Sequence, residues 1–415
     1  MIALAFVLVA AAVLGADSSS ASTAQTYFVD SERGDDAGAG TSAEEAWRTL
    51  NRVNDATLRP GDRVLLRRGG SWTGTLRIDR SGSKRAAIVV TSYGRGQLPV
   101  VRGGSSCVEL RGSYLVVRNV HADDCRWAGI AVWGSYNKIE RSLITRNAAG
   151  IHVRSSGVGT RIIRNRLVDN DKMSVLTQRP ADDDSGAFGV LLEGDGSEVA
   201  YNTISGCDAF SYDYGRDGAA VEVYGGRRNR IHHNLALDND AFAELGNPRS
   251  ERNTYSVNVI RSSLPRSTFL VTRGARSRLG PVLRTSALHN TVVLTGATSQ
   301  GVVCHAGCSP NILTLRNNII QAVWKVGFAD GPFAEGNNLF SGGALEFTQR
   351  TSSRIGNPLF RNLSRGNLRL RPSSPAIDAG AAVGIRRDFD GRRVPADGDG
   401  DGVARPDLGA FEFRR

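Results

Sequence analysis

The middle of the chain repeats one short pattern of strands and turns. Five successive copies read VELRGSYLVVRNVHADDC, IAVWGSYNKIERSLITRN, IHVRSSGVGTRIIRNRLVDN, VLLEGDGSEVAYNTISGC and VEVYGGRRNRIHHNLALDN, beginning at Val108, Ile130, Ile151, Val190 and Val221. Each copy holds a short alternating strand, a polar or glycine turn, a second apolar strand and a polar corner. A single coil of this kind cannot bury its apolar side, so successive coils must stack. The pattern therefore predicts an all-β parallel solenoid.

An asparagine recurs close to the second strand of the copies. The set is Asn119, Asn165, Asn202, Asn234, Asn258, Asn290, Asn317 and Asn337. Amide side chains at a repeated corner can hydrogen-bond to one another along a parallel stack. We therefore predict that these asparagines form a structural ladder.

The two ends of the chain differ from the repeats. Ser42 and Glu45 have capping-box spacing, and Trp47, Leu50 and Val53 follow as an apolar stripe. This predicts a short helix that caps the first coil, where an open strand edge would otherwise be free to pair. The composition changes again from about residue 357, and we expect that segment to close the other end.

The beginning and the end of the chain also resemble a known superfamily. The stretch YFVDSERGDDAGAGTSAEEAWRTLNRVN, with PGDRVLLRRGGSWTGTLRI after it, is similar to the start of secreted right-handed parallel β-helix proteins of the pectate-lyase-like superfamily. The segments NPLFRN, LRLRPSSPAIDAGA, DFDGRRV and DLGAFE resemble the tail of many bacterial members. The resemblance implies a right-handed parallel β-helix that binds sugars on the outer face of one sheet. It does not fix the reaction, because the superfamily contains lyases, glycosidases, epimerases and non-catalytic surface proteins.

These features divide the chain into four segments. We expect a signal peptide at 1–24, a cap and first coils at 25–100, a β-helix with a substrate groove at 101–356, and a C-terminal cap at 357–415. The apolar run from Ile2 to Gly15 is shorter than the roughly 20 residues that cross a bilayer, but it suits a signal-peptide core with cleavage after Ala24. The mature protein is therefore expected to be secreted, without a membrane span, and monomeric.

Charge and cysteines add two expectations. The net charge is +11, but no lysine or arginine tract supports nucleic-acid binding. A basic surface can instead attract an acidic polysaccharide. Of the five cysteines, Cys107 with Cys125 and Cys304 with Cys308 are plausible disulfides, which suit export and leave Cys207 unpaired.

The strand alternation predicts which side chains face outward. Apolar residues such as Val221 and Val223 point inward, so their neighbours point to the solvent side. The functional outward set is Trp133, His152, Arg154, Glu193, Glu222 and Tyr224. Aromatic rings can stack on sugars, and charged groups can bind hydroxyls or a carboxylate. We therefore predict a substrate-binding face here.

Glu244 lies one coil after Glu222. The glycine register sets it off by one residue, so we expect a local bulge to bring it outward. Two carboxylates on stacked strands can be about 5 to 9 Å apart, the range used by glycosidases. The catalytic pair is therefore predicted as Glu222 and Glu244, with Asp217 and Asp240 as further candidates.

Two insertions, 170–189 and 207–218, precede outward-facing strands and are expected to wall a groove. Asp182, Asp183 and Asp184 in the first one are candidate Ca²⁺ ligands, and the acidic run from Asp397 is a second candidate calcium loop.

Three functions follow. The first is a glycoside hydrolase that cleaves a polysaccharide or oligosaccharide without a cofactor. The second is a Ca²⁺-assisted lyase of a uronate polymer, with Lys172 or Arg154 as the base. The third is a non-catalytic carbohydrate-binding protein.

Overall fold

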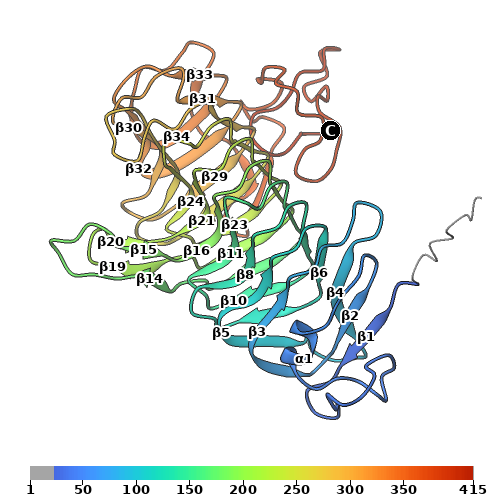
Figure 1. The fold of residues 1–415 in the computed structure, drawn as a ribbon. Coiled ribbons are helices and arrows are strands. Elements are labelled where there is room, and N and C mark those ends of the chain that lie inside the picture. The colour runs from blue at the N-terminus through green and yellow to red at the C-terminus, as the bar shows by residue number, and fades with distance from the viewer. Residues whose placement is uncertain (1–22, 415) are drawn as a thin grey trace, which may run out of the picture.

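The computed structural model describes residues 23–414, and almost all of its regular structure is β-strand (Figure 1). The expected signal peptide falls almost wholly outside these residues. Parallel strands stack coil upon coil into an elongated solenoid, as the repeats predict. The only helix of the described part has five residues, so no described helix could span a bilayer.

One sheet holds a single strand from each coil. In stacking order its 12 strands are β1 (Thr26–Val29), β2 (Arg63–Arg67), β4 (Ile88–Tyr93), β6 (Leu115–Arg118), β9 (Lys138–Glu140), β12 (Arg161–Ile163), β17 (Glu198–Ala200), β22 (Arg230–His232), β25 (Thr254–Ser256), β28 (Thr285–Leu288), β31 (Leu313–Arg316) and β33 (Ala334–Gly336).

The remaining coil strands form two parallel runs. We call the first the groove run: β8 (Ala128–Val132), β11 (Ala149–Val153), β16 (Phe188–Leu192), β21 (Ala219–Tyr224), β24 (Ala241–Gly246), β27 (Thr268–Arg273) and β30 (Gln300–His305). The second, the flank run, is β7 (His121–Asp123), β10 (Leu143–Thr145), β13 (Arg166–Val168), β18 (Thr203–Ser205), β23 (Leu235–Leu237), β26 (Val259–Ser262) and β29 (Thr291–Leu294). The long strands β3 (Ser71–Ile78), β5 (Val100–Leu110), β32 (Ile319–Ala329) and β34 (Leu339–Glu346) bend from one run into the other, and β35 (Arg354–Ile355) pairs with β34.

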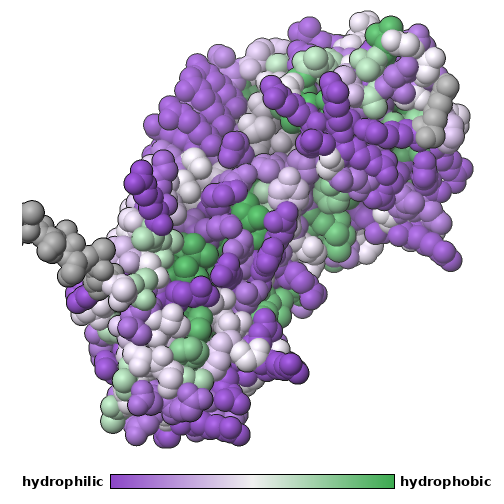
Figure 2. Space-filling view, turned by 90° about the vertical axis from the view of Figure 1, so that its right-hand side faces the viewer, coloured by the Kyte–Doolittle hydropathy of each residue, from purple (hydrophilic) through white to green (hydrophobic). Residues whose placement is uncertain are grey.

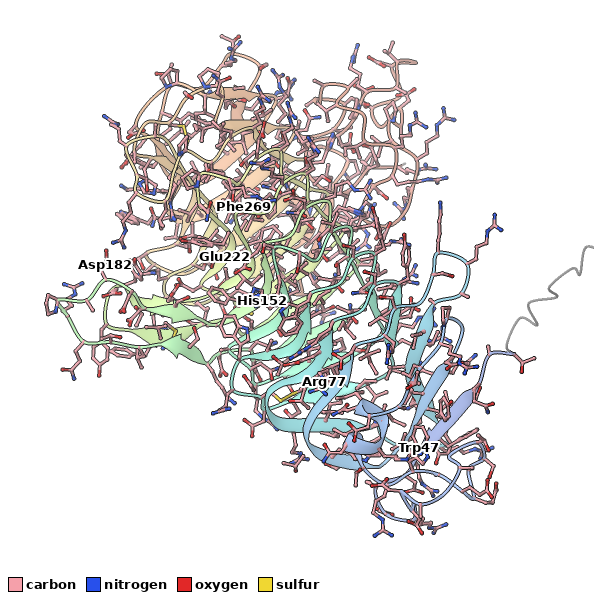
Figure 3. All side chains as sticks on the ribbon, in the orientation of Figure 1. Trp47, Arg77, His152, Asp182, Glu222 and Phe269 are labelled. Atoms are coloured by element: carbon pink, nitrogen blue, oxygen red, sulfur yellow. A yellow bond between two sulfur atoms is a disulfide. The ribbon has the colours of Figure 1, made fainter. Side chains whose placement is uncertain are left out.

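The core lies inside the coils, where the alternation predicts it. Val108, Ile130, Val190 and Val221 are fully buried and stack in register along the groove run. Large rings fill the wider coils, as Phe242 and Phe269 stack with centroids 6.0 Å apart (Phe269 is labelled in Figure 3).

The asparagine ladder is present, with a correction at its end. Each rung amide donates to the side-chain oxygen of the next coil at 2.9–3.1 Å, through Asn165, Asn202, Asn234, Asn258, Asn290, Asn318 and Asn338. Three predicted asparagines are not rungs. Asn317 and Asn337 are the residues before the last two rungs, and Asn119, near the other end, precedes Val120 and donates to the Thr91 hydroxyl at 3.4 Å. They adopt positive φ, as do Arg164 and Tyr201 before earlier rungs. Each corner has one residue in the left-handed backbone conformation, followed by one whose side-chain amide points into the coil. Asparagine is suited to both positions.

The N-terminal helix is shorter than predicted. α1 covers only Leu50–Asn54, and Thr49 caps it by accepting a hydrogen bond from the Arg52 amide at 3.2 Å. Ser42 accepts from the Glu45 amide at 3.3 Å within a turn, and Trp47 pairs with Val29 in a β-bridge. The apolar stripe is nevertheless buried, because Leu50 and Val53 pack into the first coils.

The C-terminal segment lies along the side of the coils, which corrects the expected closure of the end. Its contacts run from His233, whose ring contacts the Asp388 carbonyl, to Asn337, which donates to the Ala379 carbonyl. Phe411 packs in the same apolar cluster as residues of the flank run. The face turned to the right in Figure 1 is mainly hydrophilic, with apolar residues in small separate patches (Figure 2).

Both expected disulfides are present, Cys107–Cys125 and Cys304–Cys308. Cys207 is free and buried, and burial raises the pKa of its thiol. A structural place in the core is therefore favoured for Cys207.

Candidate active site

A groove of about 1110 Å³ crosses the outer face of the groove run. Strand pairing sets its floor, because Leu191, Glu222, Glu244 and Val271 follow one another in register on β16, β21, β24 and β27. Figure 3 shows Glu222 and His152 in the middle of this stack and Asp182 on the arm that projects to the left.

Glu222 and Glu244 are direct partners across neighbouring parallel strands. The predicted bulge is absent, since the pairing between β21 and β24 runs without a register shift. The glycine register was misleading because Gly246 lies opposite Tyr224 and not opposite Gly225. Both acids therefore point outward through ordinary strand alternation.

Glu222 has no basic or hydrogen-bonding side chain as a partner. It forms no hydrogen bond or ion pair with any residue of the described range 23–414. Burial, followed by repulsion from Glu244 and Asp217, raises the pKa of Glu222 well above its ordinary value, and Arg273 only partly opposes this. These surroundings therefore favour the protonated form of Glu222.

Glu244 has the opposite environment. Nη2 of Arg273 lies 2.7 Å from its Oε1, and this arginine is almost fully buried. A guanidinium at this distance binds the carboxyl group through a charge-assisted hydrogen bond. The groove therefore places an acid with a raised pKa beside an arginine-bound acid on the next strand.

Two more acids flank the pair. Burial, then the charges of Glu244 and Asp240, raise the pKa of Asp217 to about 7. Burial also raises the pKa of Asp240, although Arg266 contacts its Oδ2 at 3.1 Å and opposes the shift. Asp217 and Asp240 line the groove as expected and strengthen its negative field.

Glu193, another acid in the groove, lies next to the buried side chain of His152. The His152 ring is 1% exposed, its Nδ1 accepts a hydrogen bond from Trp127 Nε1 at 3.0 Å, and its Nε2 lies 3.3 Å from Glu193. Burial would raise the pKa of Glu193, but the neighbouring His152 and Arg154 lower it. His152 therefore orients Glu193 from below the surface, which corrects its expected direct contact with substrate.

The two insertions wall the groove as predicted. β14 (Met173–Val175) pairs with β15 (Ser185–Gly186), and β19 (Ala209–Ser211) pairs with β20 (Gly215–Asp217), both antiparallel. Asp184 joins the two hairpins, since its carboxylate accepts hydrogen bonds from the Thr177 amide, the Ser211 hydroxyl and the Tyr212 amide at 2.6–2.9 Å. Arg266 donates to the Tyr214 carbonyl at 2.6 Å and holds the second hairpin against the groove.

The predicted calcium triad is not assembled. Asp182 pairs with Arg278 at 2.6 Å and accepts from the Tyr214 hydroxyl at 3.2 Å. Asp213 joins Asp183 and Asp184 instead, with carboxylate oxygens within 4.8 Å of one another. Both oxygens of Asp184 already accept hydrogen bonds from the two hairpins. The cluster is therefore better suited to linking the hairpins than to binding calcium. At the C-terminal candidate loop, carboxylate oxygens of Asp378, Asp397 and Asp399 also lie within 4.8 Å of one another. The Asp378 carboxylate already accepts hydrogen bonds from backbone amides.

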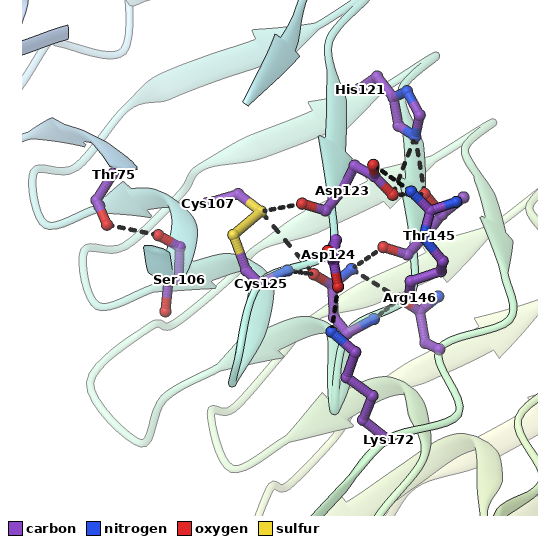
Figure 4. Close-up of a disulfide and its surroundings, with 12 residues drawn as sticks. Thr75, Ser106, Cys107, His121, Asp123, Asp124, Cys125, Thr145, Arg146 and Lys172 are labelled. Atoms are coloured by element: carbon purple, nitrogen blue, oxygen red, sulfur yellow. Dashed lines mark hydrogen bonds and ion pairs between the residues drawn. A yellow bond between two sulfur atoms is a disulfide. The ribbon is translucent and has the colours of Figure 1, made fainter. Parts of the chain in front are cut away.

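Two other predicted binding residues lie away from the groove. Lys172 Nζ lies 2.5 Å from Asp124, beside the Cys107–Cys125 disulfide (Figure 4). Trp133 does not line the groove and lies under the guanidinium of Arg111, 5.5 Å from the ring centroid. Arg154 and Tyr224 do line it, as predicted.

Several groove residues were not predicted from the sequence. They are Trp127, Tyr214, Arg266, Arg273, His305 and Trp324. Arg273 pairs in register with His305, so extending the strand alignment beyond Glu244 into TFLVTRG and QGVVCH would have found both. Tyr214 and Arg266 reach the groove through loops, for which strand periodicity carries no signal.

The chain is similar to several known proteins. A family model described as a right handed beta helix region matches residues 106–275. A lacto-N-biosidase of Bifidobacterium longum subsp. longum is 44% identical over 77 residues, which are 18% of this chain and only 5% of that protein. Among solved structures, pectate lyase Pel9A has a TM-score of 0.58 at 18% identity, over 95% of this chain and 97% of that one. XylC in complex with xylose has a TM-score of 0.57 at 9% identity, over 94% and 99% of the two chains.

The structural likenesses concern the fold, because the identities are low. They agree with the parallel stacking of the coils and with the matched family model. The chain is therefore a right-handed parallel β-helix protein, with the fold that the pectate-lyase-like resemblance implies.

Proposed function

We propose that this protein is a glycoside hydrolase that cleaves a polysaccharide or oligosaccharide in the groove. Glu222 is the general acid, and Glu244 is the nucleophile or base. The observation that carries the proposal is the direct pairing of the two acids on adjacent strands, one without a partner and one paired with Arg273. Neighbouring carboxyl groups in different surroundings can divide the roles of acid and base between them.

The chemistry follows from these two roles. Glu222 gives its proton to the oxygen of the scissile glycosidic bond, so the leaving sugar departs as a neutral alcohol. Glu244 stabilises or attacks the positive anomeric carbon. Water then supplies the hydroxyl of the new reducing end and returns the proton to Glu222. Adjacent strands are about 4.8 Å apart, close to the roughly 5 Å between the carboxyls of retaining enzymes, so we expect retention of anomeric configuration.

The surroundings support a neutral sugar substrate. Tyr224 and Trp324 offer partly exposed aromatic rings within the groove. Glu193, held by His152, can accept hydrogen bonds from sugar hydroxyls. The similarity to a lacto-N-biosidase over 77 residues also supports an enzyme that acts on a glycan. The proposed steps use only side chains of this chain and water.

A uronate lyase is the second candidate, and His305 favours it. Burial, then Arg273, lower the pKa of His305, so the imidazole is neutral near pH 7 and able to accept a proton. The neighbouring arginine could neutralise a uronate carboxylate. Arg154 remains a base candidate for such a lyase, whereas the position of Lys172 beside Asp124 removes it from consideration.

A substrate panel tests the proposal. The purified protein is incubated with neutral and acidic polysaccharides, with and without chelator, and both reducing ends and unsaturated-uronate absorbance are recorded. Hydrolysis predicts new reducing ends without absorbance and without a chelator effect. A rise in both signals on a polyuronate would replace hydrolysis by β-elimination. Binding without turnover on any substrate would favour a non-catalytic role.

A further inference from the structure

A second groove lies on the flank run, away from Glu222. Its floor is one outward row in strand register: Leu237 on β23, Arg261 on β26, Val293 on β29, Gln321 on β32 and Ser341 on β34. A row in register follows the axis of the solenoid, so this floor is long and straight.

The C-terminal hairpin forms the wall of this groove. The hairpin consists of β36 (Phe360–Asn362) and β37 (Asn367–Leu370). A cavity of about 850 Å³ lies between it and the first three strands of the row, and a cavity of about 300 Å³ continues over β32 and β34. Leu363 and Arg371 line both cavities, so the two form one track.

The larger cavity carries unneutralised positive charge. Arg261, Arg361 and Arg371 line it, and none of them pairs with a carboxylate anywhere in residues 23–414. Arg361 and Arg371 donate only to backbone carbonyls, each at 3.2 Å. Arg369 in the same hairpin shows the contrast, because Asp390 binds it at 2.6 and 2.8 Å.

Arg261 is the central charge of the three. Its guanidinium packs against Gly366 in the hairpin turn, where a Cβ would collide with it, and forms no hydrogen bond with a described residue. The only acid in the lining is Asp238, whose Oδ1 already accepts from the amide and hydroxyl of Ser263 at 2.7 and 3.1 Å. Arginine side chains in this arrangement offer free paired donors to a carboxylate or sulfate.

We propose that this track binds an anionic stretch of a linear glycan, through its carboxylate or sulfate groups. The length suits a polymer laid along the solenoid, and Ser262, Thr295 and Asn362 supply groups for sugar hydroxyls. The larger cavity has no aromatic side chain in its lining, so it offers no stacking surface for nucleic-acid bases. The site is separate from the hydrolytic groove and does not depend on the proposed reaction there.

Binding measured by calorimetry tests the proposal, with polygalacturonate, dextran sulfate and neutral dextran as probes. We expect one or both anionic polymers to bind and dextran not to bind. Arg261→Ala and Arg361→Ala should each weaken that binding about tenfold or more, and raised salt should weaken it in the parent protein. The probe that binds, carboxylated or sulfated, identifies the group.

Arg365→Ala is the matched control, since Arg365 is an exposed arginine of the same turn that does not line the cavity. It should leave affinity within about twofold. Equal weakening by all three variants would mean diffuse attraction to the basic surface and would overturn the site. No binding of either polymer, or tighter binding of a single-stranded oligonucleotide, would also overturn it. Unchanged thermal unfolding of the variants confirms that they fold.

Discussion

Two groups of buried acids in this protein have raised pKa values, yet their surroundings differ. In the groove, the pKa of Asp217 is raised to about 7 and that of Glu222 well above its usual range. In the C-terminal segment, burial raises the pKa of Asp407 to about 7 and that of Glu412 to about 8. A raised pKa alone therefore does not mark an active site.

The two groups of acids differ in the hydrogen bonds that they accept. Asp407 accepts from the Asp378 amide, and Glu412 accepts from the Asp407 and Ala396 amides, at 2.8–3.0 Å. These carboxyls replace regular backbone pairing in a segment that has little secondary structure. Glu222 accepts no such bond within the described residues and faces a large groove. An acid that accepts no hydrogen bond and faces a groove is therefore the better candidate for a catalytic role.

The largest expected contrast is between two glutamate replacements. Glu244→Gln removes the carboxyl group beside Glu222 and should lower kcat by about 10²–10⁴-fold, with an unchanged unfolding midpoint. Glu412→Gln should keep kcat within about threefold and lower the unfolding midpoint. Kinetics and thermal unfolding of both variants check this. If Glu412→Gln lost activity while remaining folded, the two groups would not be separable in this way.

The cation beside Glu244 gives the next effect. Arg273→Ala removes the guanidinium that binds and orients Glu244 and should lower kcat/KM by about 10–100-fold near neutral pH. The pH profile should also shift: Arg273 lowers the pKa of Glu222, so its removal raises that pKa further and moves the limb that reports Glu222 to higher pH. Arg276→Ala is the control, since this arginine is exposed and pairs with Asp330. Equal losses in both variants would argue against a specific role for Arg273.

Asp407→Asn probes the structural group alone. The new side chain still has one acceptor oxygen, but its NH2 group would face either the Phe413 or the Asp378 backbone amide, where an acceptor is needed. We expect the free energy of unfolding to fall by about 1–3 kcal/mol, measured by denaturant titration. Asp401→Asn, at an exposed loop acid, should change it by less than about 0.5 kcal/mol. A stable Asp407→Asn variant would remove the structural role from this carboxyl.

The pH dependence of stability tests the same C-terminal acids. Asp407 and Glu412 have folded-state pKa values above their unfolded values of about 4, so the folded protein binds more protons between about pH 4 and 8. Their contribution to stability is present below about pH 4 and is lost as pH rises through 7 to 8. The unfolding free energy should therefore fall over this window, by up to about 1.4 kcal/mol per pH unit per proton. Glu412→Gln should flatten the fall, and an equal slope in both proteins would contradict the assignment.

Sequence periodicity predicted the solenoid, its inward residues and the outward position of Glu222, because alternation within a strand is a local property. It missed the register of Glu244, since glycines after strands need not align between coils. The two hairpins were correctly expected to wall the groove. The partners of Asp182 and Lys172 were not predictable, because Arg278 and Asp124 come from distant loops. The ladder was offset by one residue where two asparagines adjoin, at Asn317 and Asn337, and it does not include Asn119, which Val120 follows.

The most direct test of the central claim is the rate of reducing-end release by Glu222→Gln, on the glycan that the substrate panel identifies. The glutamine keeps the size of the side chain but cannot donate a carboxyl proton. Near-ultraviolet circular dichroism confirms the fold, because Trp127 and Tyr224 line the same groove. We predict a rate at least about 10²-fold below that of the parent protein. A folded Glu222→Gln variant with the full rate would contradict the assignment of this acid and of the paired-carboxylate mechanism.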